Sequence, residues 1–174
     1  MKKNNKYALL LLIILLVFNL PACDFSWQRY YNKEHRFSIL LPRFWQKEQG
    51  AYDTVILAKE SPRGRDDKFS ENINVVITEF AEPISLATCY ELNKEELFKS
   101  LVLIDLAEGD IFAGMLPGSW LSFKSRIKEI KVKVLSAIFV KGKHGYTITC
   151  ISEEEKYPKY EPVFFTIIRS LRPK

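Results

Sequence analysis

The chain carries at positions 130–150 the run IKVKVLSAIFV-KGKHG-YTITC, which decides its fold. Apolar residues alternate with lysines over Ile130–Val134, and this period of two predicts a strand with one buried and one wet face. A short polar turn follows at Gly142–Gly145, and Tyr146–Cys150 then resumes the strand pattern. Two strands joined by a glycine-containing turn predict an antiparallel hairpin.

Other segments upstream and downstream carry strand or helix patterns. Upstream strands are predicted at Phe37–Leu41, which Pro42 ends, at Val55–Ala58 and at Ile73–Thr78. One helix is expected after Pro83, with Ser85 as its N-cap, and a second is expected to begin at Pro162. The apolar faces of the two helices are Leu86, Tyr90, Leu97 and Leu101, and Phe164, Ile167, Ile168 and Leu171.

This order of elements predicts the fold class and the domain count. Strands, a helix, more strands and a closing helix are typical of an α+β fold, in which helices pack on the faces of an antiparallel sheet. Apolar residues make up 47% of the chain and aromatic residues 13%, which indicates a packed core rather than a disordered segment. Residues 30–174 are therefore expected to form one α+β domain.

The first 22 residues have the three regions of a secretory signal peptide. Lysines open the chain, an apolar run extends over Ala8–Phe18, and the small residue Ala22 stands at the expected cleavage site. A transmembrane anchor is the weaker interpretation, because a spanning helix needs about 20 apolar residues and this run is much shorter. An ordinary signal peptide followed by a chance cysteine is the other alternative.

The residues around the cleavage site resemble a lipobox. Leu20, Ala22 and Cys23 match the site at which bacterial lipoproteins receive a diacylglyceryl group on the cysteine, although Pro21 departs from the usual small or β-branched residue. The resemblance implies cleavage between Ala22 and Cys23 and acyl chains on Cys23, which would be the lipid-bilayer contact. Asp24 resembles the inner-membrane retention signal of enteric-type bacteria. The expected location is the bacterial cell membrane, facing the periplasm or the exterior, with the inner membrane favoured.

Residues 23–29 are expected to be the lipidated cysteine and a short tether. The six residues Asp24–Arg29 reach roughly 20 Å when extended, so the domain must lie close to the lipid. Two interpretations of the aromatic residues here stay open. They suit the headgroup region of a membrane, or Tyr30 and Tyr31 already belong to the first strand. The aromatic residues are Phe25, Trp27, Tyr30 and Tyr31.

Charge and cysteine content limit the classes of partner. Removal of residues 1–22, which hold three lysines and no acid, lowers the formal net charge from +5 to +2, and no basic block remains, so nucleic acid is a poor candidate. Cys89 and Cys150 are a possible disulfide in an oxidising compartment. The alternative is that both are buried thiols, because geometry decides pairing.

The sequence shows no catalytic, metal or cofactor motif. HExxH, GxSxG, P-loop and dinucleotide glycine patterns are missing. His35 and His144 are interpreted as surface residues, and Glu153–Glu155 as a solvated acidic turn. Tyr157 and Tyr160 follow in what is expected to be a loop that caps the core or binds a partner.

The order of these motifs resembles the PsbP-like and Mog1-like family over Tyr30–Arg172. The motifs are the FSILLPRFW opening at 37–45, the strand 73–78 with its helix entry at 83–86, the YTIT hairpin at 146–149 and the FxxIIRSL close at 164–171. The resemblance implies an α-β-α sandwich and a non-enzymatic accessory protein, some members being bacterial lipoproteins. It places Trp45 in the core beneath a helix.

Two functions from different classes are carried forward. The first is a membrane-anchored accessory or binding lipoprotein that presents its domain to a protein partner at the membrane or in the envelope. The second is a carrier or sensor of a small hydrophobic ligand, which requires an apolar pocket of roughly 300–1,000 Å³ between sheet and helix. An enzyme would require His35 or His144 to lie beside a carboxylate or cysteine in a cleft.

Overall fold

The computed structural model describes residues 25–62, 64 and 67–174. Its elements, in chain order, are β1 (Trp27–Asn32), β2 (Phe37–Pro42), β3 (Gln46–Glu48), a 3-10 helix (Ala51–Asp53), β4 (Ile56–Lys59), β5 (Asn72–Glu79), α2 (Leu86–Ser100), β6 (Ile104–Ala113), β7 (Leu116–Ile127), β8 (Ile130–Lys141), β9 (His144–Glu153), α3 (Tyr157–Arg169) and β10 (Arg172–Pro173).

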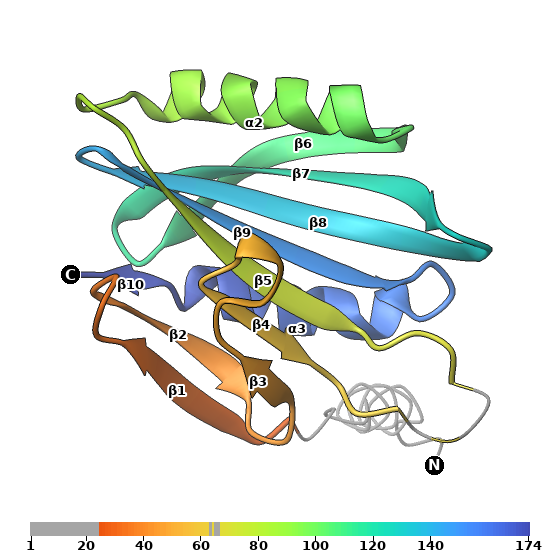
Figure 1. Cartoon of the computed structure of the whole chain (residues 1–174). Helices are drawn as coiled ribbons and strands as arrows, with labels where there is room; N and C mark the ends of the chain where they lie inside the picture. Colours follow the sequence, from red (N-terminus) through yellow and green to blue (C-terminus); the bar gives the residue numbers. More distant parts are fainter. Residues whose placement is uncertain (1–24, 63, 65–66) are drawn as a thin grey trace, which may run out of the picture.

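These strands form two antiparallel sheets. Within the described residues, the larger sheet has seven strands in the order β3-β4-β5-β9-β8-β7-β6, and the smaller has three in the order β1-β2-β10. Helix α2 lies on one face of the large sheet, and α3 lies on the opposite face together with the small sheet (Figure 1). The α+β fold with helices on both faces of an antiparallel sheet is confirmed.

The hairpin predicted from positions 130–150 lies near the centre of the large sheet. β8 and β9 pair from Val132 opposite Glu153 to Lys141 opposite His144. The turn is therefore the two residues Gly142 and Lys143, shorter than the four expected. Gly142 has a φ of 63°, which glycine adopts without strain and which a type II′ turn needs at its first central position.

The helix predictions differ in accuracy. Ser85 caps α2 as expected, because its side chain accepts a hydrogen bond from the backbone N–H of Thr88. The predicted start of α3 at Pro162 is wrong: the helix begins at Tyr157, and Pro162 lies inside it. A proline in a helix interior costs about 3 kcal/mol, which the buried side chains of this helix offset. Those side chains are Tyr157, Tyr160, Val163, Phe164, Ile167 and Ile168.

Three strands of the large sheet, β3, β6 and β7, have no counterpart among the predicted elements. β6 contains Asp, Glu and Gly residues that interrupt its alternation, and in β7 the first residue is followed by Pro117 and Gly118, which are typical of turns. Packing explains the glycine at position 118, because a Cβ there would clash with the ring of Phe139 on the neighbouring strand.

The first strand begins earlier than the boundary placed at residue 30. β1 starts at Trp27, within the range interpreted as a tether, and both Tyr30 and Tyr31 belong to it. Phe25, Trp27 and Tyr30 pack against the main core. The strand interpretation of these aromatics is therefore the right one, and the segment ahead of the domain is shorter than expected.

The core has one part on each face of the large sheet. Beneath α3, the main cluster includes Phe164 and Ile167, both 0% exposed, and Trp45, whose ring centroid is 6.5 Å from that of Tyr160. The smaller cluster beneath α2 includes Phe123 and Ile138. Trp45 thus lies in the core beneath a helix, as the sequence resemblance implied.

Candidate interaction surface

Three residues named from the sequence lie outside the described part of the chain. They are Ala22 and Cys23 at the expected cleavage and lipidation site, and Asp24, the expected retention signal. Phe25 is the first described residue, and its side chain is half-buried against the domain. Among the described residues no helix has the length and apolarity that crossing a membrane requires.

The possible disulfide between Cys89 and Cys150 is not formed. Both cysteines are free and buried. Cys89 lies on α2 in the cluster on one face of the sheet, and Cys150 points from β9 into the cluster on the other face. The sheet separates the two thiols, and burial raises the pKa of each, which keeps them in the protonated, unreactive form.

The two histidines, 109 positions apart in the sequence, line the same hollow. His35 and His144 lie with Glu34 and Glu79 around a space of about 300 Å³. His144 and Glu79 are direct cross-strand partners on β9 and β5. Both histidines lie at the surface, as interpreted from the sequence, but their common hollow was not predicted. Among the described residues, however, no three His, Cys, Asp or Glu side chains are grouped so that they could hold a metal ion.

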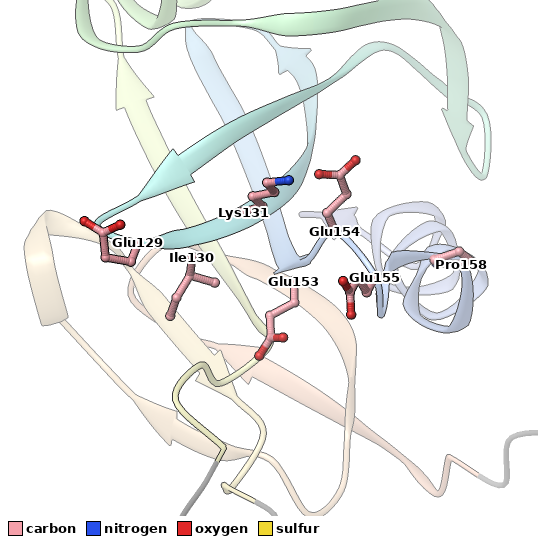
Figure 2. Close-up of a pocket in the computed structure, with 7 residues that line it drawn as sticks. All are labelled: Glu129, Ile130, Lys131, Glu153, Glu154, Glu155 and Pro158. Atoms are coloured by element: carbon pink, nitrogen blue, oxygen red, sulfur yellow. The ribbon is translucent and has the colours of Figure 1, made fainter.

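A second hollow, of about 650 Å³, is lined by acidic residues at the far end of the central hairpin. Figure 2 shows that its four carboxylates point in different directions and do not converge on one point. Two of these carboxylates form salt bridges with lysines: Glu154 is 2.9 Å from the Lys124 Nζ, and Glu153 is 3.0 Å from the Lys156 Nζ. The lining residues are Glu129, Ile130, Lys131, Glu153, Glu154, Glu155 and Pro158.

Lys156 also joins the start of α3 to the segment ahead of β5. Its ammonium group lies 3.0 Å from Asp67 and 3.4 Å from Glu71, whose side chain is 3% exposed. Burial raises the pKa of Glu71, and the neighbouring Lys156 opposes that rise. The ionised form of Glu71 is therefore tolerated in the fold because Lys156 is beside it.

We expect Lys156→Met to lower the free energy of unfolding by about 1–3 kcal/mol at pH 7. This loss is smaller than that for a fully buried ion pair, because Lys156 is partly exposed and solvent screens its charge. A carboxyl group whose pKa is higher in the folded than in the unfolded protein stabilises the fold at pH values below its ordinary pKa of 4.5. This stabilisation is lost as the pH rises through the folded-state pKa. The lysine's removal raises that pKa further. The loss should therefore be small near pH 4 and full at pH 7.

Urea unfolding at both pH values measures this difference. Lys131→Met is the matched control, because Lys131 is exposed, and it should change stability by less than about 0.5 kcal/mol at either pH. An equal loss at pH 4 and pH 7 for Lys156→Met would show that the ionisation of Glu71 plays no part.

The space between α3 and the large sheet is filled by side chains. Phe164, Ile167 and Ile168 are each 0% exposed between α3 and the sheet. Five surface hollows among the described residues, of about 300 to 650 Å³, are lined mainly by residues of loops and strand ends. This packing argues against the ligand-carrier alternative, which required an apolar pocket between sheet and helix.

The edge of the large sheet carries a concentration of exposed apolar side chains. β6 is the last strand of the order, and it follows directly on the C-terminal end of α2. Between positions 98 and 106 five large apolar side chains are exposed, and we call this segment the apolar edge. They are Phe98 (52%), Leu101 (39%), Val102 (76%), Ile104 (54%) and Leu106 (40%).

Polar contacts hold the apolar edge in place. Glu108 on β6 accepts a hydrogen bond from the Tyr90 hydroxyl at 2.8 Å and pairs with Lys94 at 2.6 Å, so it ties β6 to α2. The Lys94 and Tyr90 hydrogen bonds lower the pKa of Glu108 and keep it ionised. Lys124 on β7 pairs with Asp105 at 2.7 Å, where β6 bulges. A bulge and charged residues protect an edge strand from pairing with an arbitrary second chain.

The sequence interpretation missed the apolar edge. Leu101 was assigned to the packed face of the helix, but it lies just beyond the end of α2 and is exposed. The available signal was the run FKSLVLIDL at 98–106, which has more apolar residues than one short connection needs. Contiguous exposed apolar surface marks sites of protein interaction.

The comparisons with known proteins support a fold class. No protein-family model matches the chain, and no curated protein matches it in sequence. Solved structures share its architecture, and the chain has a PsbP-like fold, as the sequence resemblance predicted.

Three of these structures can be named. Cyanobacterial PsbP from Synechocystis has a TM-score of 0.63 at 16% identity, over 88% of this chain and 96% of that one. LpqN from Mycobacterium tuberculosis, which is involved in cell envelope biogenesis, has a TM-score of 0.65 at 10% identity, over 84% and 89%. PA94 from Pseudomonas aeruginosa, a protein of unknown function, has a TM-score of 0.59 at 15% identity, over 86% and 98%.

Proposed function

We propose that this protein is a non-enzymatic accessory lipoprotein of the bacterial cell envelope. Acyl chains on Cys23 hold it on the membrane, with the periplasmic face of the inner membrane favoured by Asp24. Its PsbP-like domain binds a membrane or envelope protein through the apolar edge. The observation that carries the binding role is the group of five exposed apolar side chains within nine residues of that edge.

The position of the apolar edge supports this role. The start of β1, which leads from the proposed anchor, lies at the bottom of Figure 1, whereas α2 lies at the top on the other side of the large sheet. An anchored domain in this orientation presents the end of α2 and the beginning of β6 away from its point of attachment. LpqN, which is involved in cell envelope biogenesis, has the same type of fold.

Site-specific photo-crosslinking in native membranes tests the proposal. A photoreactive phenylalanine analogue at Val102, which is 76% exposed, should give one discrete cross-linked product. Ile104→Asp in the same chain should reduce that product at least tenfold, because a charge would be buried against the partner. Ile104 is 54% exposed, so the substitution should leave the stability within about 0.5 kcal/mol.

The same analogue at Tyr52 is the matched control. Tyr52 is 89% exposed and lies in the short 3-10 helix between β3 and β4, away from the apolar edge. It should give no discrete product. The binding proposal fails if position 102 yields no more product than position 52, or if Ile104→Asp leaves the yield unchanged.

A further inference from the structure

An aromatic side chain is exposed beside the first residue of the described domain. Phe44 is 80% exposed in the loop between β2 and β3. The backbone N–H of Arg43 donates to the carbonyl of Ser26 at 2.7 Å, so this loop is fixed against the segment that leads into β1. Phe25, Phe44 and Trp45 line one hollow of about 320 Å³.

The distance to the proposed anchor is short. Phe25 is two positions after Cys23, and an extended chain spans at most about 7 Å over that interval. If acyl chains leave Cys23 for the membrane, as the proposed function requires, the surface around Phe25 has to face the bilayer. Phe44 belongs to that surface through the contact between Arg43 and Ser26.

The loop is held rigid and carries positive charge. The Lys47 ammonium group donates to the carbonyls of Arg43 and Trp45, both at 3.1 Å, and so fixes the backbone on both sides of Phe44. Arg43 is exposed, and the Nζ of exposed Lys159 lies 5.4 Å from the centroid of the Tyr160 ring, whereas Glu60 is the acidic residue among those that line the hollow with Phe44. Phospholipid headgroups with net negative charge attract basic groups of this kind.

Three of the four aromatics that the sequence offered for the headgroup region pack against the domain, and the fourth, Tyr31, is exposed near the other end of β1, where the Lys174 Nζ lies 5.9 Å from its ring centroid. Trp27 and Tyr30 lie in β1 and pack against the core, and Phe25 is half-buried between Trp27 and Tyr160. Phe44, next to the contact between Arg43 and Ser26, is 80% exposed.

We propose that Phe44 and Arg43 form a second bilayer contact beside the lipid anchor. The Phe44 ring enters the boundary between headgroups and acyl chains, and Arg43 binds a lipid phosphate. The acyl chains alone would leave the domain free to tilt, whereas this second contact fixes its orientation and directs the apolar edge away from the membrane. The inference rests on the lipidation proposed above.

Fluorescence depth measurements on the full-length lipidated protein test this contact. A Phe44→Cys variant, purified with its acyl chains, is labelled with an environment-sensitive dye and placed in vesicles of phosphatidylethanolamine and phosphatidylglycerol. The label reports position 44, because the Cys23 sulfur is acylated and Cys89 and Cys150 are buried. Tyr52→Cys and Met115→Cys, at residues that are 89% and 95% exposed, are the matched controls.

The expected result is an increase of at least twofold in emission at position 44, with strong quenching by nitroxide-labelled lipids. Neither should occur at positions 52 and 115. Arg43→Glu should reduce the quenching at position 44, and the reduction should be greatest in vesicles rich in phosphatidylglycerol. A label at position 44 that behaves like those at 52 and 115 overturns the inference.

Two further outcomes separate the causes of failure. Intact mass measured on the same sample shows whether Cys23 carries acyl chains: their absence overturns both the anchor and this contact, whereas acylation without a response at position 44 overturns the contact alone. A response in native membranes but not in protein-free vesicles would show that a protein covers Phe44, which also overturns the lipid contact.

Discussion

Replacement of Cys23 by alanine is expected to remove every acyl chain from the protein. The cysteine sulfur is the acceptor of the diacylglyceryl group in the proposed lipoprotein, and alanine offers no nucleophile in its place. Each buried methylene of an acyl chain contributes about 0.8 kcal/mol to membrane binding, and stable anchoring takes two chains. The whole of that contribution should therefore be lost.

Intact-mass spectrometry of protein made in a bacterial host measures this effect. The wild-type mass should equal residues 23–174 plus two or three acyl chains, and Cys23→Ala should carry no acyl mass and keep residues 1–22. Cys89→Ala is the control, because this buried cysteine plays no part in anchoring, and its acyl mass should be that of the wild type. A wild-type chain cleaved elsewhere and free of lipid would contradict the lipoprotein proposal and make the protein a freely diffusing exported domain.

Phe164→Ala is expected to lower the free energy of unfolding by about 3–5 kcal/mol. Phe164 is 0% exposed in α3, with its ring centroid 5.9 Å from that of Tyr160 and 6.2 Å from that of Tyr157. Truncation would leave a cavity between α3 and the sheet that these rings, held in close packing, cannot fill. The loss would be a large part of the stability typical of a single domain.

Chemical denaturation followed by far-ultraviolet circular dichroism measures the difference in the free energy of unfolding between the wild type and Phe164→Ala. Phe44→Ala is the matched control, since the same side chain is removed from a position that is 80% exposed, and it should change stability by less than about 0.5 kcal/mol. Comparable losses for the two variants would mean that α3 is not packed on the sheet as described.

In the proposed function, the two ends of the domain bind different partners. Figure 1 places the start of β1 and α2 on opposite sides of the large sheet. In the proposed function, the first end contacts lipid through Cys23, Arg43 and Phe44, and the second end offers the apolar edge to a protein. A rigid core between the ends would keep the binding surface at a constant distance from the membrane.

Features that depend on neighbouring residues were predictable from the sequence. The hairpin at 130–150 follows from its alternation and glycine turn, and the cap at Ser85 from a side chain that reaches the backbone three residues later. The lipobox-like residues around Cys23 likewise form a linear pattern. The α+β class followed from the order of such local signals.

Contacts between distant residues were decided by the tertiary structure alone. Pro162 could lie inside α3 because residues far away in the chain bury its helix, and β6 pairs with β7 although its own alternation is broken. Cys89 and Cys150 lie on opposite faces because the sheet runs between them. Local propensities involve energies of about 1 kcal/mol or less per residue, or about 3 kcal/mol for proline in a helix, so burial by remote partners can override them. The sequence by itself therefore determined the central hairpin, the cap of α2 and the lipobox-like pattern, whereas burial in the tertiary structure decided the apolar edge, the shared hollow of the histidines and the position of Phe44 beside the segment that leads into β1.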